Sequence, residues 1–280
     1  MAEQQRTTVQ SQMIDLTTGR FHYLSWNAGR LELPGVLLLH GLTSSAWTWT
    51  RVGSALAARY RVYALDLRGH GESVKSEIGT YGFPQLAADA AAFLEAVKLQ
   101  RSVLIGISWG GAIVLVLASG SGLQKPAPAF SQVILVDPAL DVLSSSEEEV
   151  EVLAAISSIN RPASEWRSEI AAGYPHMSED EIESRIEAFR QVTPEALRSI
   201  YAQEGQMGDL LPLLAKIPAP TLLLRADAAL GSALDDTTWQ QAKQYLPAHS
   251  HSVEIAGATH TIHWSKFAEF IQQIYRFIEN

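Results

Sequence analysis

The chain has 280 residues, of which 47% are hydrophobic and 18% are charged, a composition that excludes a disordered polar chain and suits one large domain. The formal net charge is −9 and no cluster of Lys and Arg stands out, so nucleic acids and anionic membrane surfaces are not expected partners. The lack of cysteine excludes disulfides, thiolate metal sites and a cysteine nucleophile.

The first residues, Met1–Leu16, lack the basic stretch followed by an apolar run that makes a signal peptide. Apolar runs elsewhere, such as Val36–Leu39, are only as long as a strand, so we expect no membrane span. Together with the lack of cysteine, these features predict a cytoplasmic location.

In the first half of the chain, strand-like and helix-like segments alternate. Val36–Leu39 is a short apolar run between Pro34-Gly35 and His40-Gly41, which is typical of a central strand covered on both faces. The strands expected here are Arg20–Trp26, Val36–Leu39, Val62–Leu65, Ser102–Ile107 and Gln132–Val136. The helices expected here are Ala46–Tyr60, Phe83–Leu99 and Trp109–Ser119.

The pattern changes after residue 139, because no strand signal appears between about 140 and 214. The helices expected there are Glu147–Ile159, Ser164–Ala172, Glu179–Val192 and Pro194–Gln203. Strands resume at Thr221–Leu224 and Val253–Ile255, with helices at Thr237–Leu246 and Trp264–Ile278. We therefore predict an α/β fold with a mostly parallel sheet flanked by helices over 1–139 and 215–280, interrupted by a helical insertion over 140–214.

The segment Gly106-Ile107-Ser108-Trp109-Gly110 matches the G-x-S-x-G pattern. An expected strand runs directly into it and an apolar expected helix leaves it, which is the context of a nucleophile elbow. Such a turn holds the Ser108 hydroxyl clear of the sheet, beside backbone N–H groups that can stabilise an oxyanion. The five-residue pattern alone would also fit an ordinary loop serine, but the flanking strand and helix favour a nucleophile.

Three further segments, together with the elbow, resemble the α/β-hydrolase fold superfamily over nearly the whole chain. They are the HG loop His40–Leu42, the D-x-R-G-x-G-x-S loop Asp66–Ser73 and the G-x-x-H segment Gly257–His260. The resemblance implies that the backbone N–H groups of Leu42 and Trp109 form the oxyanion hole. It also implies that the helical insertion is a cap over the active site.

A serine hydroxyl needs a neighbouring imidazole to take its proton. His260 follows the last expected strand, at the sheet edge where the elbow also lies, and we favour it as the base. His263 is the rival, but we interpret it as a packing or helix-start residue. No HExxH pattern or second ligand cluster accompanies the pair, so we expect no metal and no organic cofactor.

The triad acid is not settled by the sequence. In most relatives the acid follows the strand Thr221–Leu224, but Ala229 occupies that position here. Asp137, at the end of an earlier strand, is the preferred candidate, because some branches of the family place the acid there. Asp227 is the alternative. Asp235 and Asp236, which resemble a helix N-cap, are more distant options.

These motifs predict a hydrolase that cleaves a small, largely uncharged ester or lactone through a Ser-His-Asp triad and an acyl-enzyme. Trp109 is also expected to shape the substrate pocket. Ser108 argues against haloalkane dehalogenases and epoxide hydrolases, which use an aspartate nucleophile in this superfamily. A carbon–carbon bond hydrolase, a proline-iminopeptidase-like peptidase, a cofactor-free perhydrolase and, in another class, a hydrolase-like ligand receptor stay open. We expect a small-molecule substrate and leave homo-oligomerisation open.

Overall fold

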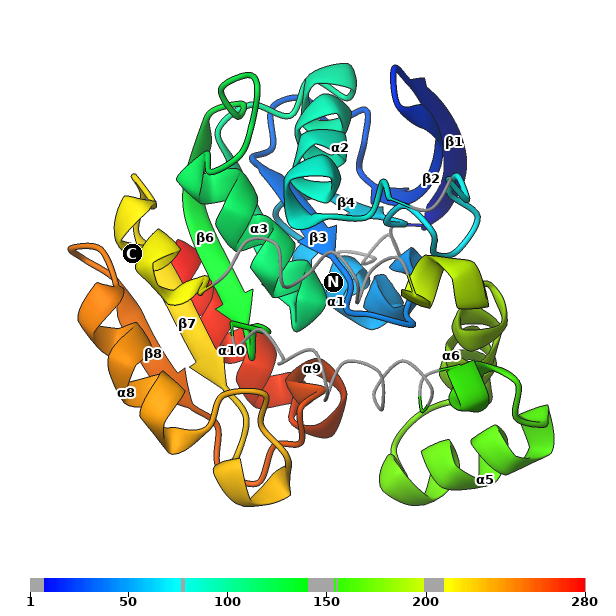
Figure 1. Cartoon of the computed structure of the whole chain (residues 1–280). Coiled ribbons are helices and arrows are strands. Elements are labelled where there is room, and N and C mark those ends of the chain that lie inside the picture. The colour runs from blue at the N-terminus through cyan, green and yellow to red at the C-terminus, as the bar shows by residue number, and fades with distance from the viewer. Residues whose placement is uncertain (1–7, 77–78, 141–153, 155, 199–208, 280) are drawn as a thin grey trace, which may run out of the picture.

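The central element of the protein is one twisted sheet, which runs through the middle of the computed structural model in Figure 1. The structure describes residues 8–76, 79–140, 154, 156–198 and 209–279. Its strands are β1 (Gln10–Leu16), β2 (Gly19–Trp26), β3 (Gly35–Leu39), β4 (Arg61–Leu65), β5 (Ser102–Ile107), β6 (Phe130–Val136), β7 (Thr221–Arg225) and β8 (His251–Glu254). They lie in the order β1-β2-β4-β3-β5-β6-β7-β8.

The sheet is mostly parallel, as predicted. Strand β2 pairs antiparallel with both β1 and β4. All the other neighbours, along β4-β3-β5-β6-β7-β8, pair in parallel. Successive residues of β3 face opposite layers: Leu37 and Leu39 lie in one apolar core, and Val36 and Leu38 in the other. A strand covered on both faces needs a continuous apolar run, which explains the sequence signal at this position.

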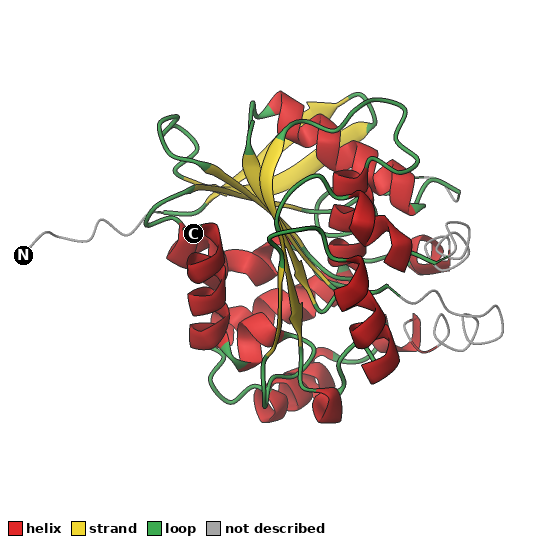
Figure 2. Cartoon of the chain, turned by 90° about the vertical axis from the view of Figure 1, so that its left-hand side faces the viewer, coloured by secondary structure: helices red, strands yellow, loops and turns green. Residues whose placement is uncertain are grey.

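Helices cover both faces of the sheet, as Figure 2 shows. Helices α2 (Phe83–Ala96), α3 (Trp109–Ser119) and α8 (Asp236–Tyr245) pack on one face, and α1 (Thr50–Leu56) and α10 (Phe267–Ile278) pack on the other. Short helical turns are η1 (Ala46–Trp49), η3 (Leu211–Lys216), η4 (Ala228–Leu230) and α9 (Ile262–Ser265). None of the helices that the structure describes is long and apolar enough to span a membrane.

Between β6 and β7 the chain forms the helices α5 (Ala163–Gly173) and α6 (Glu179–Arg190), which stand beside the sheet in Figure 1. A capping box, for which Ser178 and Glu181 have the required spacing in the sequence, begins α6: the Ser178 side chain accepts from the Glu181 amide, and the Glu181 carboxylate accepts from the Ser178 amide. The two helices enclose a small apolar core of their own. The expected helices at 147–159 and 194–203 fall partly outside the described residues.

Three elements differ from the prediction. Strand β1 was not expected, because most of its side chains are exposed and leave no hydrophobic alternation; it forms by pairing with β2. The helix expected over 46–60 is the turn η1 followed by α1. The helix expected over 264–278 breaks at Lys266, whose φ of −134° is not helical, so that α9 and α10 are separate.

Candidate active site

The elbow at Ser108 is a one-residue turn between a strand and a helix. Strand β5 ends at Ile107 and helix α3 begins at Trp109, so that only Ser108 joins them. Its φ of 54° and ψ of −124° lie in a region that residues other than glycine rarely adopt. The Ser108 amide donates to the Val136 carbonyl at 2.9 Å, which fixes the strained turn to the end of β6.

The turn is possible because glycines let three backbone segments approach each other. A methyl group on Gly106 would lie 2.2 Å from the Gly110 carbonyl oxygen, and one on Gly110 would lie 2.3 Å from the His40 carbonyl oxygen. A methyl group on Gly41 would lie 3.3 Å from Ser108 Cβ. The elbow, helix α3 and the loop after β3 are therefore in backbone contact, and larger side chains would force them apart.

The structure brings His260 together with Asp137. His260 lies in the loop between β8 and α9, and its Nδ1 is 2.6 Å from Asp137 Oδ2. Asp137 directly follows β6, has a φ of 42° and is fully buried, whereas the His260 side chain is about one-third exposed (35%). With Nδ1–H donated to the carboxylate, His260 Nε2 is left as the proton acceptor.

The loop after β7 surrounds the Asp137 carboxylate with hydrogen-bond donors. Oδ1 accepts from the Ala226 amide at 3.1 Å and from Ser232 Oγ at 2.7 Å, and Oδ2 accepts from the Ala233 amide at 2.9 Å. The loop after β7 thus supplies hydrogen-bond donors to the carboxylate that follows β6. Ser232 had no sequence signal, because it is distant from Asp137 along the chain.

Asp227 has a different role in the structure. It is only partly exposed, and its carboxylate accepts from the Ala229 amide at 2.9 Å and from the Gly257 amide at 2.8 Å. These backbone hydrogen bonds lower the pKa of Asp227 below its usual value. Asp227 thus caps η4 and ties it to the loop after β8, and its carboxylate has no contact with His260. Asp235 caps α8, where it accepts from the Thr238 amide at 2.6 Å.

Two buried histidines hold the expected oxyanion loop. His40 Nδ1 lies 2.8 Å from the Gly41 carbonyl, and His40 Nε2 accepts from the Leu67 amide at 3.0 Å. His70 Nε2 accepts from the Thr43 amide at 3.3 Å. Burial lowers the pKa of His40 to about 4 and that of His70 to about 3, so both rings stay neutral and can accept.

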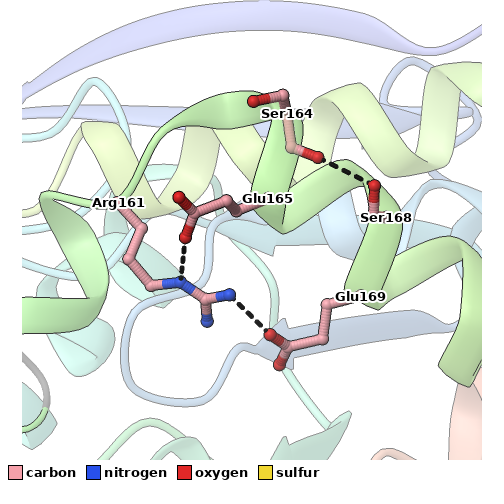
Figure 3. Close-up of a pocket in the computed structure, with 5 residues that line it drawn as sticks. All are labelled: Arg161, Ser164, Glu165, Ser168 and Glu169. Atoms are coloured by element: carbon pink, nitrogen blue, oxygen red, sulfur yellow. Dashed lines mark hydrogen bonds and ion pairs between the residues drawn. The ribbon is translucent and has the colours of Figure 1, made fainter.

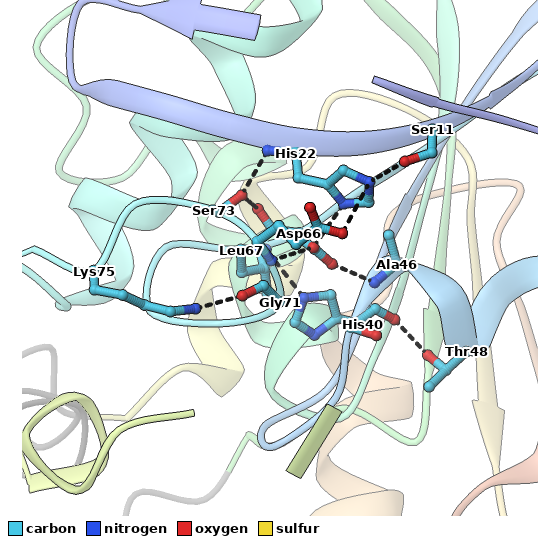
Figure 4. Close-up of polar contacts among 12 residues, drawn as sticks. Ser11, His22, His40, Ala46, Thr48, Asp66, Leu67, Gly71, Ser73 and Lys75 are labelled. Atoms are coloured by element: carbon cyan, nitrogen blue, oxygen red, sulfur yellow. Dashed lines mark hydrogen bonds and ion pairs between the residues drawn. The ribbon is translucent and has the colours of Figure 1, made fainter. Parts of the chain in front are cut away.

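Figure 4 shows the buried carboxylate that organises the loop after β4. Asp66 is bonded to His22 Nδ1 at 2.7 Å and accepts from the Ala46 amide at 2.5 Å and the Glu72 amide at 2.9 Å. Burial is the largest single effect and favours the neutral acid, but the hydrogen bonds from His22 and the Ala46 amide and the electrostatic effect of His40 and His22 together outweigh it and lower the pKa of Asp66. The D-x-R-G-x-G-x-S segment therefore forms hydrogen bonds to the expected oxyanion loop and to the residues that follow it.

The side chains of Trp109 and His263 are both buried. Trp109 packs against His70 and Phe83, with ring centroids 5.5 and 6.1 Å away, so its contact with substrate stays a prediction. His263 packs against Trp49 at 4.9 Å, and burial lowers its pKa to about 3. This placement agrees with the interpretation of His263 as a packing residue.

Figure 3 shows a surface pocket on the insertion whose lining residues include no histidine that could act as a base. Arg161 there pairs with Glu165 at 3.4 Å and with Glu169 at 2.8 Å, and the Ser168 hydroxyl donates to the Ser164 carbonyl. The one cation of this pocket is paired with both of its carboxylates on the insertion's own surface. Within the described ranges we also find no group of three or more His, Cys, Asp or Glu side chains placed to hold a metal ion.

Comparison with known proteins identifies the family of this chain. A family model described as the alpha/beta hydrolase family matches residues 36–273, which include the elbow, the oxyanion loop and His260. The chain belongs to the alpha/beta hydrolase family. One fold can host many activities, so the family assignment leaves the substrate open.

Individual relatives share either a short stretch of similar sequence or the whole length at low identity. Epoxide hydrolase 4 of Mus musculus is 39% identical over 100 residues, but the match covers 35% of this chain and only 27% of that protein. A 2-(acetamidomethylene)succinate hydrolase of Mesorhizobium japonicum is 25% identical over 266 residues, covering 89% of this chain and 92% of that protein. The crystal structure of the enol-lactonase from Burkholderia xenovorans LB400 has a TM-score of 0.78 at 20% identity, covering 96% of this chain and 100% of that one, which shows a shared fold.

The neutral buried histidines predict a loss of stability in mild acid. In the unfolded chain His70 takes up a proton through pH 6.5, whereas the folded ring stays neutral down to about pH 3. Its contribution to the free energy of unfolding should therefore fall by about 1.4 kcal/mol for each pH unit below 6.5. We expect His70→Gln to show a flatter pH dependence than the native chain in urea titrations at pH 7, 6 and 5. The exposed His176→Gln is the control, and an unchanged slope in His70→Gln would contradict the assignment.

The hydrogen bond from His260 predicts which carboxylate activates the serine. A fluorophosphonate reacts with a serine whose proton a neighbouring base removes, so its labelling rate reports on that activation. We expect Asp137→Asn to slow labelling of Ser108 by about 10²–10⁴-fold, since the amide favours the wrong His260 tautomer. Asp227→Asn should label within about threefold of the native rate, because it alters only a surface cap. The reverse order in a labelling assay read by peptide mass spectrometry would assign the acid to Asp227.

Proposed function

We propose that this hydrolase cleaves a small carboxylic ester or lactone through an acyl-enzyme, with Ser108 as nucleophile, His260 as base and Asp137 as acid. The observation that carries the proposal is the 2.6 Å contact between His260 Nδ1 and the buried Asp137 carboxylate, at the sheet edge where the strained Ser108 turn lies. A base oriented by a carboxylate beside a strained serine is the arrangement that acyl transfer requires.

In the proposed reaction Ser108 Oγ attacks the substrate carbonyl while His260 Nε2 takes the hydroxyl proton. The Asp137 carboxylate stabilises the resulting imidazolium through Nδ1–H. When the tetrahedral intermediate collapses, the bond to the leaving oxygen breaks and His260 returns the proton to that oxygen. Water then attacks the acyl-Ser108 ester with His260 again as base, releasing the acid and restoring the serine hydroxyl.

Two backbone amides are proposed to hold the oxyanion. Neither the Leu42 amide nor the Trp109 amide donates a hydrogen bond in the portion of the chain that the structure describes. Trp109 begins α3, where the first N–H groups have no partner within the helix and the helix dipole favours negative charge. A methyl group on Gly41 would lie 3.3 Å from Ser108 Cβ, and this closeness supports the adjoining Leu42 amide as the second donor.

The helical insertion is proposed to act as the cap, over about 140–214. Three contacts support this role. Arg185 of α6 donates to the Thr43 carbonyl at 2.5 Å, the Tyr174 hydroxyl is 2.6 Å from Thr261 Oγ1, and Leu42 packs against the apolar core of the insertion. The insertion thus contacts both the oxyanion loop and the segment that follows His260.

The names of the relatives favour hydrolysis. The substrates in those names differ, and among them are an epoxide, an enol lactone and 2-(acetamidomethylene)succinate. A serine at the elbow favours acyl transfer over epoxide opening, for which the superfamily uses an aspartate. A lactone and an ester present the same carbonyl to Ser108, so one mechanism serves both.

Turnover of p-nitrophenyl esters tests the proposal. We expect the native chain to hydrolyse short or medium acyl esters and Ser108→Ala to lose at least about 10³-fold in kcat, because no other group replaces the nucleophile. Ser168→Ala, the same change at an exposed serine on the surface of the insertion, is the matched control. Its turnover should stay within about threefold of native.

Activity that survives in Ser108→Ala would contradict the serine mechanism. If the native chain turns over none of the esters or lactones offered, ester hydrolysis is wrong. Carbon–carbon bonds, peptides and single-turnover ligand binding would then be the next activities to assay.

A further inference from the structure

An arginine of the insertion lies beside the proposed oxyanion hole. Arg185, on α6, donates through Nη1 to the carbonyl of Thr43, the residue after Leu42. Its guanidinium carbon is 3.8 Å from the centre of the Phe189 ring and 5.7 Å from that of Trp264, four residues after His260. The Arg185 guanidinium therefore lies between the loop that carries Thr43 and the segment that follows His260.

No described residue supplies a counter-charge to the Arg185 guanidinium. Across the parts of the chain that the structure describes, Arg185 forms no ion pair with Asp or Glu, although it is half-buried. Of the three buried arginines, Arg68 pairs with Asp89 at 2.8 Å and Arg225 with Asp236 at 2.7 Å. The third, Arg61, donates to the Leu33 carbonyl at 3.1 Å. A guanidinium has five N–H donors, and one described bond uses only one of them, so a bidentate contact with an anion is still open.

The charge of Arg185 affects the pKa of two histidines near the proposed site. Burial lowers the pKa of Arg185 to about 10, which leaves it cationic at neutral pH. After the larger effect of burial, its charge further lowers the pKa of His40, behind the oxyanion loop, and of His263, three residues after His260. An unpaired charge in such surroundings is costly, and an anion that binds there would remove the cost.

The position of Arg185 is fixed by the way the insertion meets the core. The Tyr174 hydroxyl bonds to Thr261 Oγ1, and the Tyr174 ring packs edge-on against Trp264 at 5.6 Å. Arg185 itself stacks on Phe189 of its own helix. These contacts hold the guanidinium plane without a carboxylate, which is the preorganisation that a binding residue needs.

We propose that Arg185 binds a carboxylate of the substrate, so that the preferred substrate is an ester or lactone of a dicarboxylic acid whose second carboxylate stays ionised. The carboxylate fits the planar fork of Arg185 while the other carbonyl meets Ser108. This inference rests on the proposed function for the bond that is cleaved, and it replaces the expectation of a largely uncharged substrate. The proposed carboxylate binding itself does not depend on turnover.

Matched esters measure the effect on hydrolysis. We expect Arg185→Gln to lower kcat/KM for p-nitrophenyl hydrogen adipate by about tenfold or more, mainly through KM, and to change that for p-nitrophenyl hexanoate by less than about twofold. Arg185→Lys should recover only part of the loss, since it keeps the charge but not the fork. Arg190→Gln, an exposed arginine on the same helix, should match the native chain with both esters. Equal losses on the two esters, or no loss on either, would overturn the proposal.

A binding measurement separates this proposal from the catalytic one. In Ser108→Ala, which cannot turn over, we expect adipate to raise the melting temperature and the neutral adipamide to leave it unchanged. Adding Arg185→Gln should abolish the adipate effect. If no ester is hydrolysed but this pattern holds, the carboxylate site stands and the proposed function fails. If esters are hydrolysed through Ser108 but adipate stabilises the Arg185→Gln double variant equally, the carboxylate site is wrong and the proposed function stands.

Discussion

The close approach of three backbone segments at the elbow is the constraint on which the rest of the site depends. Gly106, Gly110 and Gly41 leave no room for side chains where β5, α3 and the loop after β3 meet. This contact forces Ser108 into its left-handed conformation and sets the start of α3 beside the oxyanion loop. The proposed nucleophile and oxyanion donors are therefore positioned by backbone contacts, which is what electrostatic preorganisation requires.

The second half of the site is assembled from the ends of neighbouring strands. Strand β6 supplies Asp137, the loop after β7 supplies donors such as Ser232 to its carboxylate, and the loop after β8 supplies His260. Because these strands are parallel neighbours, their carboxyl ends converge on one edge. The acid can therefore come from β6 or from β7 and still reach the same imidazole, provided that the other strand's loop satisfies the carboxylate.

What the sequence predicts well is what depends on local pattern. The elbow, the buried parallel strands and the capping box at Ser178 follow from residue order within a few positions, and the structure has all of them. Strand β1 gave no signal, because its side chains are exposed and its pairing with β2 is not encoded in alternation. The choice between Asp137 and Asp227 and the position of Arg185 depend on contacts between residues far apart in the chain, which no local pattern records.

The central claim is that Ser108 forms a covalent acyl intermediate, and trapping that intermediate tests it most directly. A slowly hydrolysed ester would be mixed with the native chain, quenched in acid within the first turnover and analysed by peptide mass spectrometry. The account predicts that the peptide containing Ser108 gains the mass of the acyl group, and that Ser108→Ala gains none. An acyl group on another residue, or multiple turnovers without any adduct, would contradict it.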